Sequence, residues 1–143
     1  MIKTILAPIA FDQPGQDSLD YAVRLAARLG ASVCAVHVYT IPVYGFPDGV
    51  VVTAPELAAR LSEAAQAHLD AAVDAQKRHG VKLTSVLVTG NPWEEIVEVA
   101  RARKADLIVM GTHGRHGLPR AIMGSVAERV LRTSEIPVLT VRG

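Results

Sequence analysis

Residues 107–125 read LIVMGTHGRHGLPRAIMGS, and this strand-loop-helix pattern indicates both a fold class and a site. The stretch begins with a short apolar run, Leu107 to Met110, that is typical of a buried strand. A glycine-rich connection then leads to Ser125, where a helical pattern starts and where the serine is expected to cap the helix. The first backbone N–H groups of a helix have no partner within the helix, so this arrangement predicts an anion site.

The alternation of short apolar runs with helical patterns extends over the whole chain. Strands are predicted at Thr4 to Ile9, Ser32 to Tyr39, Leu83 to Val88, Leu107 to Met110 and Val138 to Val141. Helices are predicted from Asp17 or Ser18 to a stop at Gly30, from Pro55 to His79, from a cap at Asn91, and from Ser125 to Thr133. Strands that alternate with helices predict a doubly wound, Rossmann-like α/β fold, with helices on both faces of a parallel sheet.

Composition restricts the class of protein further. The 143 residues suit one domain, residues 1–143, built around one core. Fifteen Lys and Arg against 14 Asp and Glu give a net charge of +1, which argues against a nucleic-acid partner. The longest apolar run, Ile5 to Phe11, is too short for a membrane span or a secretory signal, and the single Cys34 can form no internal disulfide. A cytoplasmic protein with no membrane partner is therefore expected.

Other signatures of chemistry are missing. The glycine-rich connection has no Lys before Ser125, as a P-loop requires, and no Gly-x-Gly-x-x-Gly or Gly-x-Ser-x-Gly motif occurs. His113 and His116 have no Cys or carboxylate cluster beside them, so no metal site is predicted. His37 is interpreted as a core histidine whose hydrogen bond is satisfied. No catalytic set can be assigned.

The pattern Gly111-x2-Gly114-x9-Gly124-Ser125 resembles the ATP-binding signature of the universal stress protein family. Further segments resemble the same family: Ile5-Leu6-Ala7-Pro8, Val36-His37-Val38, Gly90-Asn91-Pro92 and Ile136-Pro137-Val138-Leu139. The resemblance implies a five-stranded sheet in the order 3-2-1-4-5, with a crevice between the carboxyl ends of the first and fourth strands, where the strand order reverses. It also implies a homodimer that forms through the last strand, Val138 to Val141.

The resemblance places an adenine nucleotide, expected to be ATP with or without Mg²⁺, in this crevice. Pro8, Ile9, Ala10 and Val38 are expected on the adenine and ribose side, Met110 at the end of the fourth strand, and Gly111, Gly114, Gly124, Ser125 and Val126 around the ribose and phosphates. Arg115 is expected to add a positive charge near the phosphates. The implied function is a small stress-response or signalling module with slow or no hydrolysis.

One residue departs from the family pattern. Nucleotide-binding members usually have an Asp two residues after the proline that matches Pro8, whereas this chain has Ala10, and Asp12 follows two positions later. Losing a charge-assisted hydrogen bond costs about 1.5–3 kcal/mol, so weaker binding is expected. The alternative is a nucleotide-free dimeric interaction or regulatory protein of the same fold. The long connection from Thr40 to Ala54 is either functional or of no consequence.

Overall fold

The computed structural model describes residues 1–10, 13–41, 44–49, 51–52, 54–77, 80–112 and 123–142. Five parallel strands form the main sheet: β1 (Thr4–Pro8), β2 (Ser32–Tyr39), β5 (Leu83–Thr89), β6 (Leu107–Gly111) and β7 (Val138–Val141). Their order across the sheet is β5-β2-β1-β6-β7, which confirms the predicted order 3-2-1-4-5. In the described residues, four helices cover this sheet: α1 (Gln13–Leu29), α2 (Pro55–Asp74), α3 (Pro92–Ala102) and α4 (Ser125–Thr133).

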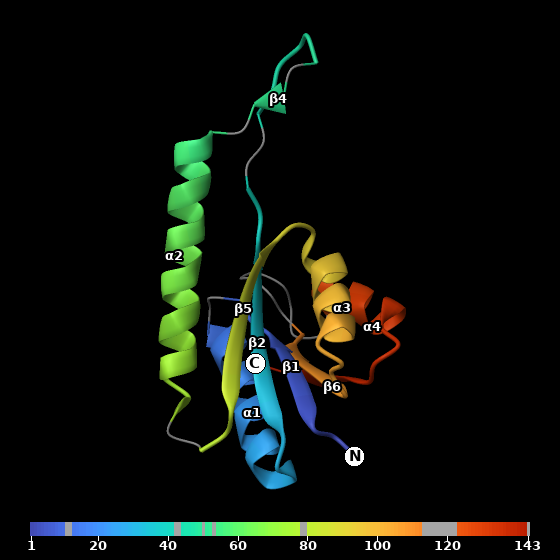
Figure 1. Ribbon diagram of the computed structural model, residues 1–143. Coiled ribbons are helices and arrows are strands. Elements are labelled where there is room, and N and C mark those ends of the chain that lie inside the picture. The colour runs from blue at the N-terminus through green and yellow to red at the C-terminus, as the bar shows by residue number, and fades with distance from the viewer. Residues whose placement is uncertain are drawn as a thin grey trace.

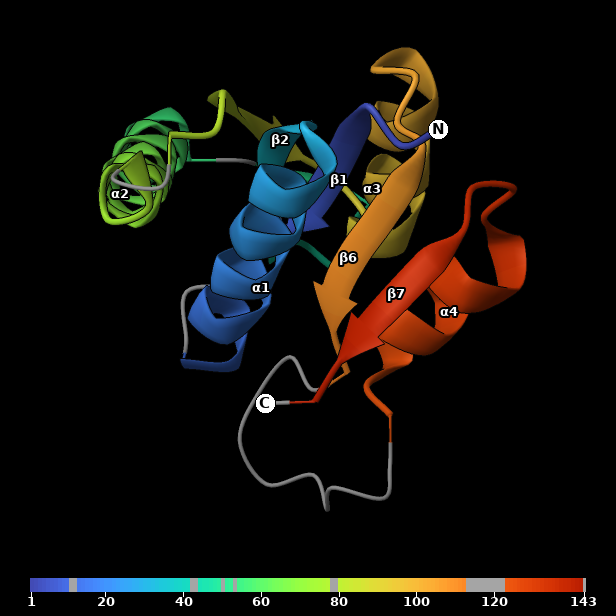
Figure 2. The same cartoon turned by 90° about the horizontal axis from the view of Figure 1, so that it is seen from below.

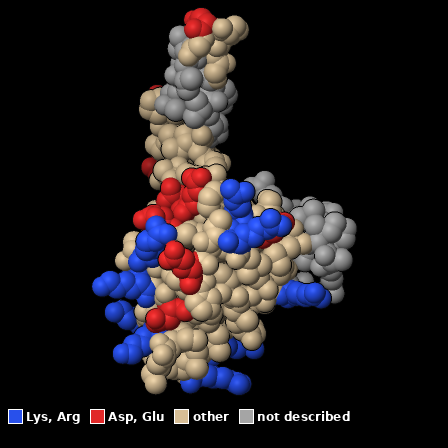
Figure 3. Space-filling model, turned by 90° about the vertical axis from the view of Figure 1, so that its right-hand side faces the viewer, with Lys and Arg blue, Asp and Glu red and all other residues tan. Residues whose placement is uncertain are grey.

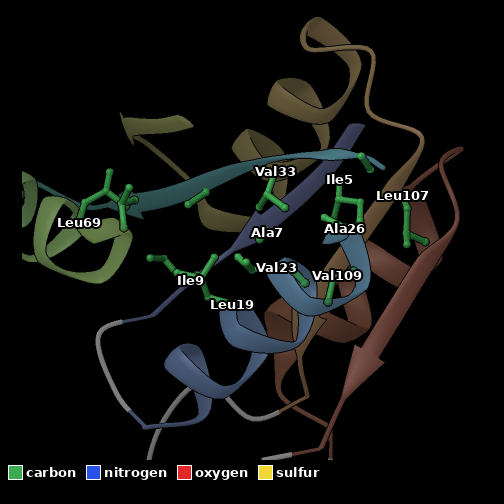
Figure 4. Packing of buried hydrophobic residues seen from close by; sticks show 14 residues of the cluster. Ile5, Ala7, Ile9, Leu19, Val23, Ala26, Val33, Leu69, Leu107 and Val109 are labelled. Atoms are coloured by element: carbon green, nitrogen blue, oxygen red, sulfur yellow. The ribbon is translucent and has the colours of Figure 1, made fainter. Parts of the chain in front are cut away.

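The two faces of the sheet are buried under different pairs of helices. Figures 1 and 2 show α1 and α2 on one face, and α3 and α4 on the other. The buried apolar residues form two clusters, one on each face of the sheet. Ile5 of β1 packs in the first cluster, with residues of α1 and α2. The next residue, Leu6, packs in the second cluster, with residues of α3 and α4. Figure 4 shows the first cluster, with Leu19 and Val23 of α1 facing the strands. Burial on both faces explains why the strands read as continuous apolar runs.

Helix α1 begins earlier than the sequence predicts. It starts at Gln13, so Asp17 and Ser18 are not its N-cap but lie inside the helix, and Ser18 is buried. Pro14 belongs to the first turn, where a missing N–H is tolerated. The helix ends at Leu29, before Gly30 with its φ of +69°, and this end confirms the predicted stop.

Helix α2 ends earlier than the predicted His79. It stops at Asp74, directly after Val73, the last residue of its buried stripe. The described residues that follow directly, 75–77, bury no apolar side chain, so no apolar packing supports a further helical turn there. Gly80, which has a φ of +71°, redirects the chain instead of ending the helix.

The connection from Thr40 to Ala54 contains a short hairpin that the sequence analysis does not predict. Strands β3 (Tyr44–Gly45) and β4 (Val51–Val52) pair antiparallel, and the amide of Gly49 donates to the carbonyl of Phe46 at 2.9 Å within the turn. Figure 1 shows this hairpin projecting from the body of the molecule. Strands of two residues are too short to produce a recognisable alternation of apolar and polar residues in the sequence.

Asp106 joins the start of β6 to the start of β1. Its Oδ2 accepts hydrogen bonds from the amides of Lys3 at 2.8 Å and Thr4 at 3.0 Å. Its own amide donates to the carbonyl of Thr4 at 2.8 Å. The hydrogen bonds from Lys3 and Thr4 hold the pKa of the Asp106 carboxyl below its ordinary value, because they favour the charged form.

Replacement of Asp106 with Ala is expected to lower the urea midpoint of unfolding at neutral pH, because two strand amides lose their acceptor. The lowered pKa means that the carboxylate stabilises the fold above the unfolded pKa, near 3.8, and that this stabilisation is lost as the pH falls through the folded pKa. Wild type and Asp106→Ala should therefore converge in strong acid, with Asp106→Asn intermediate at neutral pH. Equal midpoints at neutral pH would contradict this role.

Candidate functional site

The sheet opens between β1 and β6 at the carboxyl ends of these strands. β1 pairs with β2 along its whole length, from Thr4 to Pro8. With β6 it pairs only at Ile5, opposite Leu107, and at Leu6, opposite Ile108. The two central strands of a doubly wound sheet separate at this point, which is the usual place of a ligand.

Pro8 contributes to this opening. The carbonyl of Thr4 accepts a hydrogen bond from the residue that precedes β6, and successive residues of a strand face opposite neighbours, so Pro8 also faces β6. Proline has no amide hydrogen to donate to a ladder. The next residue, Ile9, faces β2 again and donates to the carbonyl of Val36 at 2.9 Å. The described strand pairing of β1 with β6 thus stops at Leu6, whereas the attachment to β2 continues to Ile9.

A cavity of about 420 Å³ lies at the opening, within the size range of small-molecule sites. The structure brings together there the predicted residues Pro8, Ile9, Ala10, Val38, Met110, Gly111, Gly124, Ser125 and Val126. Gly114 and Arg115 lie outside the described residues. Seven further residues line the cavity and were not predicted as site residues: Ser18, Val36, His37, Pro92, Ile96, Thr112 and Ala127. Ligand contact by any of these residues stays a prediction.

The start of α4 forms one wall of the cavity. The N-cap is Gly124, in extended conformation, and Ser125 is the first helical residue, so the prediction of a capping serine is wrong. The amide of Gly124 donates to the carbonyl of Thr112 at 2.6 Å, and the amide of Thr112 donates to the carbonyl of Val141 at 3.1 Å. The described ends of the glycine-rich connection are thus joined to each other and to β7.

The N-terminus of α3 lies beside that of α4. Asn91 occupies the predicted cap position, although its side chain makes no capping hydrogen bond. Trp93 is partly buried against the second cluster. The guanidinium carbon of Arg129 lies 4.6 Å from the centroid of its ring, a cation–π contact between α3 and α4. This contact joins the first turn of α3 to the middle of α4, and both helices contribute residues to the cavity lining.

His37 is the site residue that the sequence analysis assigned to the core. Its Nδ1 lies 2.8 Å from the carbonyl oxygen of Ile9, so the predicted hydrogen bond is confirmed, but the side chain is half-buried at the cavity. Burial lowers the pKa of its imidazole more than the hydrogen bond to Ile9 raises it, and His68 lowers it further. The position near the carboxyl end of a central strand is the signal that identifies it as a site residue.

Charges on the face that carries α3 and α4 compensate one another locally. Figure 3 shows acidic and basic side chains side by side on this face. Within the helices, Arg101 pairs with Glu98 at 3.1 Å and Arg132 with Glu128 at 2.7 Å. Selectivity for an anion would therefore have to come from the cavity rather than from a general positive surface.

The described part of the chain holds no group of three or more His, Cys, Asp and Glu residues that could bind a metal ion. His113 and His116 are not among the described residues. None of the described helices is long and apolar enough to cross a membrane.

The chain is similar to known proteins over almost its whole length. The model of the universal stress protein family matches residues 1–142. The chain belongs to the universal stress protein family. One member, universal stress protein MJ0531 of Methanocaldococcus jannaschii, is 37% identical over 144 residues, which cover 99% of this chain and 83% of the relative. Another, from Thermus aquaticus, is 35% identical over 99% of this chain and 100% of the relative.

Solved universal stress proteins have the same fold. The structure of the protein MJ0577 has a TM-score of 0.82 and 27% identity, over 100% of this chain and 97% of the other. The crystal structure of a universal stress protein in complex with cAMP has a TM-score of 0.73 and 26% identity, over 99% of this chain and 97% of the other. That family member thus binds an adenine nucleotide.

The imidazole of His37 is expected to titrate below its ordinary pKa of 6.5, because burial disfavours the charged ring. The unfolded chain then takes up this proton at a higher pH than the folded chain does. The free energy of unfolding should consequently decrease as the pH falls from about 6.5 through the folded pKa. NMR titration of the histidine rings, with His37 assigned through His37→Asn, measures the midpoint directly. A midpoint at or above 6.5 would contradict the effect of burial.

Proposed function

We propose that this universal stress protein binds adenine nucleotides, ATP among them, in the cavity between the ends of β1 and β6. The observation that carries the proposal is the hydrogen bond from the amide of Gly124 to the carbonyl of Thr112. It brings both described ends of the glycine signature to the rim of an apolar cavity, at the positive end of α4. A ligand with an apolar base and an anionic tail fits this combination best.

The adenine side of the site would be the wall formed by β1 and β2. Pro8, Ile9 and Ala10 follow one another at the end of β1, and Val36 and Val38 face the same cavity from β2. The side chains of Pro8, Val36 and Val38 offer apolar contacts to a flat base, while the backbone of Ala10 can donate to and accept from its polar edge.

The phosphate side would be the first turn of α4. Its N-terminal N–H groups and the positive end of its dipole favour an anion, and Gly124 has no Cβ to keep a phosphate at a distance. The described lining residues include no carboxylate, so Mg²⁺ would enter this site held by the phosphates rather than by those side chains.

A related complex supports the proposal. A universal stress protein with the same fold, 26% identical to this chain, binds cAMP. We propose binding as the function, with slow or no hydrolysis, because the described cavity residues include no carboxylate and no catalytic set can be assigned among them. Through the bound nucleotide the protein would act as a stress-response or signalling module.

Titration with ATP and Mg²⁺, followed by the fluorescence of Trp93, tests this function, since Trp93 is the only tryptophan and adjoins the lining residue Pro92. Wild type is expected to bind. Gly124→Val should abolish binding, because its side chain would occupy the proposed phosphate position. Ala10→Asp should tighten binding by about ten- to a hundredfold, because it restores a charge-assisted hydrogen bond.

Ala27→Asp is the matched control, since it adds the same charge at an exposed position on α1 outside the cavity lining, and it should leave the affinity unchanged. Mass spectrometry of denatured protein would identify any nucleotide that co-purifies. An absence of binding at millimolar ATP would overturn the proposed function and favour a nucleotide-free interaction protein.

A homodimer is proposed for either function, with β7 as the contact. β7 ends the strand order, and in the described residues β6 is its one strand neighbour. The carbonyls of Pro137 and Val141 accept hydrogen bonds from the β6 side, so by alternation Leu139 also faces β6. Val138 and Thr140 then turn their backbone groups to the open edge, where a second copy can pair.

Thr140→Pro is expected to convert the dimer to a monomer in analytical ultracentrifugation, because it removes an edge N–H while leaving the ladder to β6 intact. The thermal midpoint of Thr140→Pro should stay near the midpoint of wild-type protein that has dissociated to monomers. Leu139→Pro is the matched control: it removes a hydrogen bond of the β6 ladder and should lower the thermal midpoint. A monomeric wild type, or a dimeric Thr140→Pro, would show that β7 is not the contact.

A further inference from the structure

We infer that His37 is a positioning residue of the nucleotide site, which holds the end of β1 in its binding shape through the carbonyl of Ile9. The inference rests on the proposed function, because it concerns the wall of the cavity that would receive the adenine. His37 and Ile9 belong to different strands, and their contact joins β2 to the residues at which β1 leaves the sheet.

The end of β1 has few other attachments. On the β6 side the ladder stops after Leu6, and Pro8 offers no amide hydrogen there. On the β2 side, the peptide groups of Ile9 make two hydrogen bonds: its amide donates to the carbonyl of Val36 at 2.9 Å, and its carbonyl accepts from His37 Nδ1 at 2.8 Å. The bond to His37 is therefore the last described attachment to β2 before Ala10.

His37 reaches Ile9 from the side of the sheet opposite the apolar wall. Val36 and Val38 pack in the cluster of α3 and α4, and side chains alternate along a strand, so His37 points to the face of α1 and α2. The electrostatic effect of His68, a residue of α2, on the imidazole agrees with this direction. Figure 4 shows the Ile9 side chain on the same face, near Leu19 of α1. Ile9 is thus fixed by packing of its side chain and by hydrogen bonds of its backbone.

The chemistry of this contact determines which side chains can replace His37. A carbonyl oxygen only accepts, so Nδ1 of His37 carries the hydrogen, and it does so whether the ring is neutral or charged. The amide nitrogen of an asparagine takes about the position of Nδ1, whereas that of a glutamine takes about the position of Nε2. Asparagine should preserve the hydrogen bond to Ile9, and glutamine, although equally polar, should lose it.

The test compares His37→Asn, His37→Gln and His37→Leu in ATP affinity, measured by Trp93 fluorescence, and in hydrogen exchange of the Ile9 amide. Loss of one neutral hydrogen bond that holds the site should weaken binding by about three- to tenfold in the Gln and Leu variants. Exchange of the Ile9 amide should accelerate in the same two variants. His37→Asn should keep the ATP affinity and the exchange rate of the Ile9 amide at their wild-type values. A role limited to core packing would not produce this result.

His68→Leu serves as the matched control, because it removes an exposed imidazole near His37 without touching Ile9, and its affinity should equal that of wild type. If His37→Leu does not fold, the comparison of Asn with Gln decides. Equal affinity in wild type, Gln and Leu variants would overturn the positioning role and leave the proposed function standing, as would an Asn variant that binds as weakly as Gln. A wild type that binds no nucleotide would overturn the proposed function, and the positioning role with it.

Discussion

β1 and β6 lie at the centre of the sheet, yet they pair at only two positions, and the rest of the molecule is arranged around that short contact. At the amino ends the strands are joined through Asp106, which accepts from Lys3 and Thr4. At the carboxyl ends no ladder holds them, and the proline at position 8 faces the gap. The cavity is therefore a consequence of backbone pairing rather than of small side chains. Its chemistry depends on the residues at the strand ends and at the start of α4 that line it.

The coarse fold could be predicted from sequence because its determinants are local. Apolar periodicity predicts the observed bounds of two strands and one helix: Ser32–Tyr39, Val138–Val141 and Ser125–Thr133. The other three strands of the main sheet differ from the predicted bounds by one residue at an end. The strand order, in contrast, came from the family resemblance, since periodicity does not specify which strands become neighbours.

What could not be predicted depends on contacts between distant segments. Helix α2 stops where its packing stops, and helix α1 extends four residues beyond the expected Asp17, to Gln13. The cavity residues of β1, β6 and α4 were predicted, because glycines and strand ends mark them in the sequence. His37 was assigned to the core, because nothing in its neighbourhood along the chain indicates that Ile9, 28 positions away, accepts its hydrogen bond.

The bond between Gly124 and Thr112 has a consequence for how the protein tolerates change. It joins the start of α4 to the end of β6 directly, from one backbone to the other. Insertions between the two anchored ends should therefore leave the frame of the domain intact. A lineage, or a protein engineer, can alter the length of this connection and so change its ligand or its partner without redesigning the sheet beneath it.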